Sequence, residues 1–203
     1  MVVVDPHRAG HELAYHPGEA NFRRAHVLVV NKVDSAPAEG IARVLANAAA
    51  INPSAVVVQA RSEIHVDTPE LVRGRRVLVI EDGPTLTHGE MSYGSGVIAA
   101  QAHGAAELVD PRPYAVGSLH ECFARYPWIG KLLPAEGYSP TQVTELEHTI
   151  ERTPCDTVLI ATPVNLAHLM TIRQPCTRVS YTLAEITHPD IAELADAFLE
   201  RAR

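Results

Sequence analysis

Short, unbroken apolar runs alternate with stretches of helical spacing, and this alternation restricts the fold of the chain more than any other feature. Strands buried on both faces read as continuous runs of Val, Ile and Leu, and their alternation with helices builds parallel sheets. The expected strands are Val2–Val4, Val27–Val30, Ala55–Gln59, Arg76–Ile80, Glu107–Val109, Thr157–Ala161 and Arg178–Tyr181. The sequence therefore predicts an α/β fold with a mainly parallel sheet flanked by helices.

Three stretches, Ile41–Ala48, Val143–Ile150 and Ile191–Leu199, carry apolar residues at helical spacing. The second is preceded by "SPTQ", in which Ser139 is suited to cap a helix, a Pro takes the first helical position and Gln142 follows three residues on. This predicts a capping box. In a fold of this kind, binding loops are expected at the carboxyl ends of the strands.

Composition excludes several classes of protein. The apolar runs are far shorter than the ~20 residues that cross a bilayer, and the N-terminus has no signal-peptide pattern. We therefore expect a cytoplasmic protein without a membrane partner. A net charge of -7 disfavours nucleic acid as a partner. The three cysteines, Cys122, Cys155 and Cys176, form no CxxC pair and are expected to be buried in a reducing compartment.

The run "VLVVNKVDSA" ends a predicted strand on Asn31, Lys32, Val33 and Asp34. An Asp carboxylate can accept hydrogen bonds from guanine N1 and N2, an Asn side chain can meet O6 and N7, and a Lys stem can lie along the base. Asn31, Lys32 and Asp34 are therefore candidate nucleotide-binding residues. The alternative is a simple turn, because Asn and Asp both favour strand-to-helix connections.

Asp5 follows the first predicted strand and precedes a polar loop with His7 and Arg8. An acidic residue in this position, beside Arg and His, can hold Mg²⁺ and phosphate oxygens. We therefore predict catalytic roles for these three residues and a metal-binding role for Asp5, with a solvated loop as the alternative. A zinc site on His7 and His11 is disfavoured, because the segment is not HExxH and is interrupted by Pro and Gly.

The second half offers two candidate anion sites. The segment "EDGPTLTHGEMSYGSG" leaves a strand and leads toward a helix expected near Glu90, where free backbone amides could bind phosphate. Its glycines could equally be turn residues. In "DPRPYAVGSL", an Arg could form a fork with a phosphate or carboxylate, or could simply pair with Asp110. The candidate substrate- or phosphate-binding residues are Asp82, Thr85, Thr87, His88, Arg112 and Ser118.

Several of these segments together resemble a known family. The runs "VVVDPHRAGHE", "YHPGE", "NKVD", "VIEDGPTLTHGEMSYGSG", "VDPRPYAVGS" and "ATPVNL" resemble the C-terminal portion of the predicted-GTPase family related to cyclic 2,3-diphosphoglycerate synthetase. The first part is also similar to the nickel GTPases of hydrogenase and urease maturation. The resemblance implies a P-loop NTPase-like fold. It also implies a ligase that uses GTP or ATP with Mg²⁺ to close a phosphoanhydride in a small phosphorylated substrate.

The resemblance also bears on domain organisation. A polar stretch near Arg73 separates residues 1–73, expected to belong to a nucleotide-binding, GTPase-like domain, from an α/β substrate- or anion-binding region at 74–203. Neither lysine lies in a GxxxxGK[ST] pattern. The chain is therefore expected to be a fragment that lacks the P-loop and is inactive alone. An open edge on the first strand predicts a homo-oligomer. The alternative function is a GTPase switch or metallochaperone.

Overall fold

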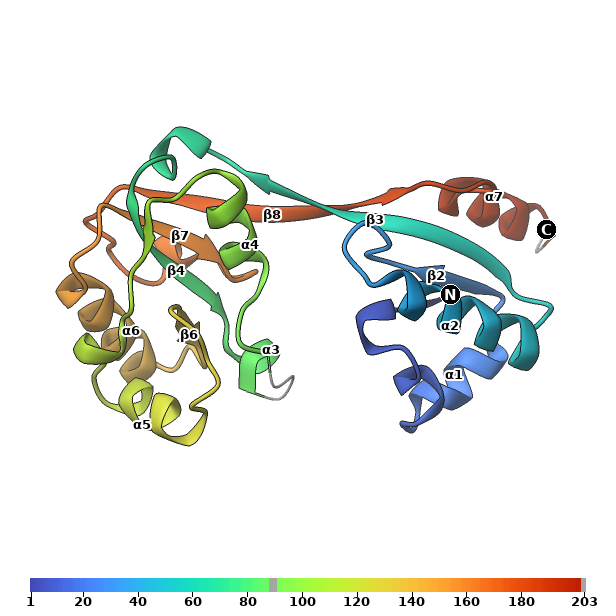
Figure 1. Cartoon of the computed structure of the whole chain (residues 1–203), viewed down its shortest axis with the longest axis horizontal. Coiled ribbons are helices and arrows are strands. Elements are labelled where there is room, and N and C mark those ends of the chain that lie inside the picture. Colours follow the sequence, from blue (N-terminus) through green and yellow to red (C-terminus); the bar gives the residue numbers. More distant parts are fainter. Residues whose placement is uncertain (88–90, 202–203) are drawn as a thin grey trace. The chain divides into compact units, whose positions relative to one another are not determined.

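The computed structural model describes residues 1–87 and 91–201. They form two compact units, which we call unit 1 (Met1–Glu63 with Tyr181–Arg203) and unit 2 (Ile64–Ser180). Two long strands, β3 (Val56–Val66) and β8 (Cys176–Glu185), pass from one unit into the other (Figure 1). Each unit contains its own hydrophobic core and its own set of parallel strand pairs.

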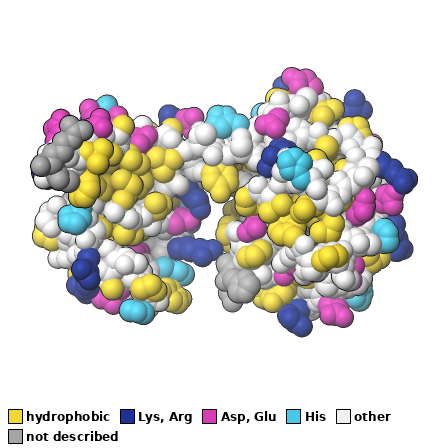
Figure 2. Space-filling view, turned by 180° about the vertical axis from the view of Figure 1, so that it is seen from behind, with side chains coloured by type: hydrophobic (Ala, Val, Ile, Leu, Met, Phe, Trp, Pro, Cys, Tyr) yellow, Lys and Arg dark blue, Asp and Glu magenta, His cyan; other side chains and the backbone are white. Residues whose placement is uncertain are grey.

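Unit 1 is built on β1 (Val2–Val4), β2 (Val27–Val30) and the first part of β3, which pair in parallel. Its helices are η1 (Pro6–Arg8), η2 (His11–Leu13), α1 (Gly18–Arg24), α2 (Ala38–Ile51) and α7 (Ile191–Arg201). In Figure 1, α1 and α2 cover one face of these strands and α7 covers the other. Phe22 and Val44 pack against Leu28 on the first face. On the second face, α7 leaves Phe198 and Leu199 exposed, so hydrophobic side chains gather there (Figure 2).

Unit 2 is centred on β4 (Arg76–Asp82), which pairs in parallel with β5 (Glu107–Leu108), β6 (Leu133–Ala135) and β7 (Thr157–Ala161). β7 pairs in parallel with β8. The helices are η3 (Pro69–Leu71), α3 (Gly83–Thr87), α4 (Ser95–Ala102), η4 (Arg112–Tyr114), α5 (Ser118–Arg125), α6 (Pro140–Arg152) and η5 (Leu166–His168). Helix α4 lies on one side of β4 and β7, and α5 and α6 lie on the other (Figure 1).

The α/β fold with a mainly parallel sheet is confirmed, and it is compatible with a P-loop NTPase-like architecture. The capping box is also confirmed, because Ser139 Oγ accepts from Gln142 N and the Gln142 side chain accepts from Ser139 N. Strand β6 was not predicted, since its three residues include a Pro that is rare in central strands. The helix expected near Glu90 begins instead at Ser95, and α3 occupies part of the segment expected to be a loop.

The two compact units divide the chain between residues 63 and 64 and between residues 180 and 181. The predicted boundary at residue 73 separates two binding roles, and it stays a prediction. Cys122 is buried, but Cys155 is half-buried and Cys176 is exposed, so burial of all three cysteines was a wrong prediction. Strand β1 pairs with β2, and Val3 of β1 is exposed. The homo-oligomer that was expected from an open edge on this strand stays a prediction. Within the described ranges, no helix combines the length and apolar character needed to span a membrane.

Candidate functional site

The carboxyl ends of β1 and β2 bring together two of the segments singled out in the sequence. The parallel register aligns Val4 with Val30, so Asp5 and Asn31 leave the sheet side by side. The Asn31 backbone N–H donates to Val4 O at 3.0 Å, and Lys32 Nζ lies 2.7 Å from Asp5 Oδ2. Residues that are 27 positions apart in the chain thus form one polar cluster in unit 1.

Asp5 is held as a charged carboxylate. It caps η1 by accepting from His7 N at 3.0 Å, while the Lys32 ammonium binds its other oxygen. Burial alone would raise the pKa of Asp5, but the hydrogen bond and charge of Lys32, with the His7 amide, hold that pKa below its usual value. Because an ammonium lies where a cation would bind Oδ2, this arrangement does not fit Mg²⁺ at Asp5, and the metal role stays a prediction. His7 Nε2 lies 3.1 Å from Ser35 Oγ.

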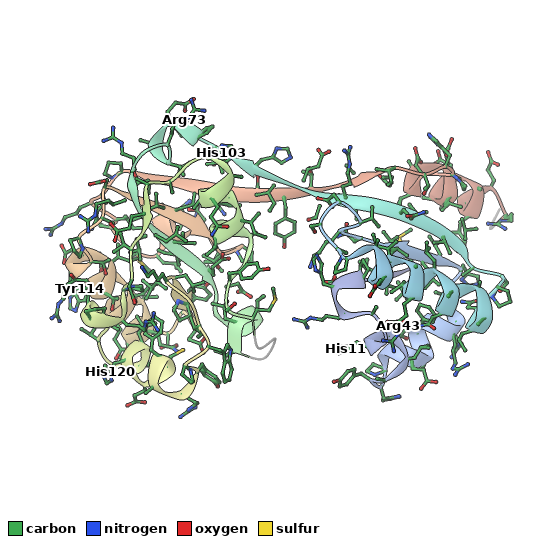
Figure 3. The ribbon with its side chains drawn as sticks, viewed as in Figure 1. His11, Arg43, Arg73, His103, Tyr114 and His120 are labelled. Atoms are coloured by element: carbon green, nitrogen blue, oxygen red, sulfur yellow. The ribbon has the colours of Figure 1, made fainter. Side chains whose placement is uncertain are left out.

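Close packing of α2 fixes the loop that carries Asp5, His7 and Arg8. A Cβ on Gly40 would collide with the Pro6 carbonyl oxygen, so only glycine lets the first turn of α2 lie against η1. One turn further along α2, the Arg43 guanidinium lies against Gly10, whose φ is +104°. Figure 3 shows Arg43 and His11 on the same side of unit 1. The loop is therefore rigidly positioned relative to the helix that follows the NKVD segment.

The NKVD segment has two features that a simple turn does not require. Asn31 Oδ1 is buried without a hydrogen-bond partner within the described part of the chain. Lys32 has a φ of +60°, a strained conformation for a residue other than glycine and one that concentrates at functional sites. Asp34 is exposed, and its Oδ1 accepts from Ser62 N of β3 at 3.3 Å. The segment therefore presents a buried acceptor and an exposed carboxylate at one strand end.

In unit 2, the end of β4 carries a buried acid that sequence analysis missed. Glu81 is 4% exposed, and its Oε1 accepts from Gly96 N at 2.8 Å and from Val97 N at 3.1 Å at the start of α4. Burial raises the pKa of Glu81 to about 7, although the helix amides oppose this rise. This carboxyl can therefore gain or lose a proton near neutral pH. The available signal was an acid at the end of an apolar strand, next to Asp82.

The Gly96 and Val97 amides at the start of α4 donate to Glu81 Oε1, so these two amides are not free to bind phosphate, and the phosphate seat stays a prediction. Thr85 Oγ1 donates to Asp82 Oδ2 at 2.9 Å, so these two predicted residues lie together. Thr87 is buried and its hydroxyl donates to Gly83 O within α3 at 3.1 Å. His88 lies outside the described residues. The binding roles of these four residues stay predictions.

Arg112 and Ser118, the other predicted anion ligands, both have protein partners. Arg112 Nε and Nη2 donate to Asp110 Oδ1 and Oδ2 at 2.9 and 2.8 Å, so the alternative of a mutual pair is confirmed. Hydrogen bonds from Arg112 lower the pKa of Asp110. The Ser118 hydroxyl and backbone N–H both donate to Glu145 Oε2. Tyr114 and His120, labelled in Figure 3, come from the same region of unit 2.

The carboxyl edge of unit 2 gathers further polar groups that the sequence did not indicate. Tyr138, just after β6, places its hydroxyl 2.7 Å from Thr162 Oγ1, just after β7. Arg178, on β8, donates from Nη2 to the Pro163 carbonyl oxygen at 3.4 Å. A Cβ on Gly83 would lie against Glu136, so a second acid also stands beside the end of β4. Among the described residues, this edge therefore carries both acids and hydroxyls beside the Arg178 guanidinium.

In unit 1, His188, Asp190 and Glu193 have ligand atoms within 4.8 Å of one another, close enough for one cation. However, Asp190 Oδ1 accepts from Glu193 N and Glu193 Oε2 accepts from Asp190 N, both at 2.8 Å. This reciprocal pattern is a helix cap at the start of α7. The cluster is explained by the helix without a metal.

These features define an α/β protein with two polar sites, each at the carboxyl ends of parallel strands, where such folds bind ligands. No family model matches the chain. Over 196 residues it is 52% identical to a protein named arginine synthetase ArcE from Thermococcus kodakarensis. The match covers 97% of this chain and 44% of the relative, so the chain spans less than half of the relative's length. The relative's name supports neither cyclic 2,3-diphosphoglycerate synthesis nor a GTPase.

Proposed function

We propose that this chain contributes to a nucleotide-dependent synthetase that forms arginine. The observation that carries the proposal is the 52% identity with arginine synthetase ArcE, which extends over 97% of this chain. The alignment extends over both units, so it supports the same fold for each of them. Because fold alone does not define function, the sites must also suit the substrates.

Unit 1 supplies the proposed nucleotide site. Asn31 Oδ1, which has no hydrogen-bond partner among the described residues, offers a buried acceptor to a purine N–H group, and Asp34 offers an exposed carboxylate nearby. Asn side chains commonly bind purine edges through paired hydrogen bonds. GTP or ATP is the proposed co-substrate, with Mg²⁺ entering together with its phosphates. His7 and Arg8 lie on the neighbouring loop, where they are proposed to approach the nucleotide.

Unit 2 suits an amino-acid substrate better than the phosphoglycerate that the family resemblance implied. A bisphosphorylated carboxylate needs several uncommitted cations around it. Instead, Asp82 and Glu136 stand at the end of β4, and Arg112 is already paired with Asp110. A zwitterionic substrate needs both signs of charge, which this edge offers.

One alternative is favoured by a specific observation. The NKVD segment, with its strained Lys32, is also typical of a guanine-reading loop, which keeps a GTPase switch or metallochaperone as the second candidate. The two functions differ in their dependence on substrate. A synthetase consumes nucleotide only when an amino acid is converted, whereas a switch hydrolyses GTP without one.

A chimera tests the proposal directly. This chain replaces the matching 196-residue stretch of the Thermococcus relative, and arginine formation is measured with ATP or GTP and candidate precursors. We expect arginine formation coupled to nucleotide consumption. A folded chimera that hydrolyses GTP without amino acid, or that forms no arginine while the parent relative does, would contradict the proposal.

The base is tested in the same chimera with Asp34→Asn. If Asp34 accepts from guanine N1 and N2, the amide variant prefers xanthosine triphosphate over GTP, because the amide can donate to the xanthine carbonyl. Glu39→Gln, an exposed change on the first turn of α2, is the control. Unchanged preferences in Asp34→Asn would exclude guanine recognition by this residue and leave ATP as the proposed nucleotide.

A further inference from the structure

Arg178 in unit 2 has a guanidinium edge that protein groups satisfy poorly. Its Nε is buried without a hydrogen-bond partner among the described residues, and Nη2 donates to the Pro163 carbonyl oxygen at 3.4 Å. Within residues 1–87 and 91–201, no acidic side chain forms an ion pair with it. Nε and Nη2 form one edge of the planar guanidinium, the edge that binds a carboxylate through two parallel hydrogen bonds. The described part of the chain therefore supplies no carboxylate to this edge of Arg178.

Strand register places two further groups on the same face as Arg178. Ile80 of β4 is aligned with Ile160 of β7, which is aligned with Arg178 of β8. Side chains alternate along a strand, so Asp82 and Thr162, each two residues on, point to this same face. The 3.4 Å contact with Pro163 shows that the long Arg178 side chain extends to the level of these residues. A cation, a hydroxyl and a carboxylate thus lie across three adjacent strands.

The hydroxyl group at the centre of this row has a second hydroxyl beside it. Tyr138 OH lies 2.7 Å from Thr162 Oγ1. Burial raises the pKa of Tyr138, and the negative charge of Asp82 adds to this effect, which indicates that Asp82 lies near the hydroxyl pair. Asp82 Oδ2 accepts from Thr85 Oγ1, while no hydrogen bond from a described residue to Oδ1 was found. Neighbouring strands are about 4.8 Å apart, so the row from β8 to β4 spans ~10 Å.

We propose that Arg178, Thr162, Tyr138 and Asp82 form a subsite for the zwitterionic head of an α-amino acid. Arg178 binds the α-carboxylate through Nε and Nη2, and Asp82 binds the α-ammonium group. The Tyr138 and Thr162 hydroxyls lie between them and can contact both charged groups. The proposed arginine-forming function identifies the amino acid, but the subsite itself is defined by the head group that all α-amino acids share.

The test measures binding of L-arginine and its derivatives to the 203-residue chain by isothermal titration calorimetry. L-arginine methyl ester lacks the carboxylate, and Nα-acetyl-L-arginine lacks the ammonium group. We expect each derivative to bind about 10- to 100-fold more weakly than L-arginine, the effect of losing hydrogen bonds to a charged group. Equal binding of L-arginine and its methyl ester would overturn the role of Arg178. Absence of saturable binding by any amino acid at millimolar concentration would overturn the subsite.

Variants connect each charge to its residue. Arg178→Gln weakens L-arginine binding about 10- to 100-fold but leaves binding of the methyl ester unchanged, because the ester has no carboxylate to lose. Asp82→Asn weakens binding of L-arginine but leaves binding of Nα-acetyl-L-arginine unchanged, because that derivative has no ammonium group to lose. Arg173→Gln is the matched control, since Arg173 pairs with Glu151 at an exposed position. If Arg178→Gln does not fold, Arg178→Lys retains the charge without the fork and carries the test.

Two outcomes separate this inference from the proposed function. If L-lysine and L-glutamine bind with the same dependence on Arg178 while the chimera forms no arginine, the subsite stands and the proposed product is wrong. If the chimera forms arginine but Arg178→Gln leaves the KM of its amino-acid substrate unchanged, the subsite is wrong and the function stands.

Discussion

Glu81 should make the stability of unit 2 depend on pH in a direction opposite to that of most carboxylates. In the folded chain its pKa is about 7, whereas the ordinary value is 4.5, because burial opposes its charge. The folded state therefore retains a proton that the unfolded state has lost. Stability from this group is full below pH 4.5, falls as pH rises to about 7 and is then constant.

The size of the effect follows from the same two values. One pKa unit corresponds to about 1.4 kcal/mol, so a rise from 4.5 to about 7 corresponds to a loss of ~3 kcal/mol across the window. Glu81→Gln removes the titration while its carbonyl oxygen can still accept from Gly96 N and Val97 N. Any steric or hydrogen-bonding difference between the two side chains is constant with pH. The stability difference between variant and wild type should therefore change by ~3 kcal/mol in favour of the variant.

Urea unfolding from pH 4.5 to pH 8.5, followed by fluorescence, measures this difference. Trp128 is the single tryptophan of the chain and donates to Leu86 O in unit 2, so its emission reports the unit that contains Glu81. Glu107→Gln, which removes an exposed acid paired with Arg76, is the control and should change the profile by less than about 1 kcal/mol. Parallel profiles for wild type and Glu81→Gln would refute the reasoning.

Three further substitutions test how the local structure is held. Gly40→Ala should destabilise unit 1 by about 1–3 kcal/mol, because the added Cβ collides with the Pro6 carbonyl oxygen. Gly18→Ala is the control, since Gly18 has open space around it and its replacement should not destabilise the unit. Thermal unfolding followed by circular dichroism compares the two variants. Asn52→Ala should cost about 2–4 kcal/mol, because Asn52 Nδ2 donates to two buried carbonyls at the end of α1, and a loss below 1 kcal/mol in urea titrations would contradict this. Ser139→Ala should cost about 1 kcal/mol by removing the capping box of α6, measured by Trp128 fluorescence, and an unchanged midpoint would contradict it.

Patterns that depend on local sequence were sufficient for much of the fold. Val27–Val30 and Thr157–Ala161 are strands with the predicted limits, because continuous β-branched and aliphatic runs have one stable environment, a sheet buried on both faces. The capping box was predicted for a similar reason, since its hydrogen bonds join residues three positions apart. The lengths of β3 and β8 were underestimated because these strands, far apart in the sequence, pair with each other, and that pairing extends them through polar residues.

The candidate sites were less predictable, because they depend on which groups the protein satisfies internally. Asp5 and Asn31 were recognised as strand-end polar residues, but the ion pair between Asp5 and Lys32 depends on the register of β1 with β2. Glu81 and Arg178 were missed because each lies in or beside an apolar run, where sequence alone does not distinguish a charged side chain at a strand end from a solvated one. Burial and strand alignment supply that distinction.

A common pattern connects the two units. Several groups that the sequence suggested as anion ligands already bind the chain's own acids. Arg112 is bonded to Asp110, and an amide at the start of α4 is bonded to Glu81. Such internal pairing makes charge alone a poor guide to ligand binding, because a paired cation must lose one partner to gain another. The groups that retain binding capacity are those with a buried atom left unpartnered within the described residues, among them Asn31 and Arg178. Each lies at or near a carboxyl edge of parallel strands, where ligands of α/β folds bind. This coincidence is why the nucleotide is proposed for unit 1 and the amino acid for unit 2.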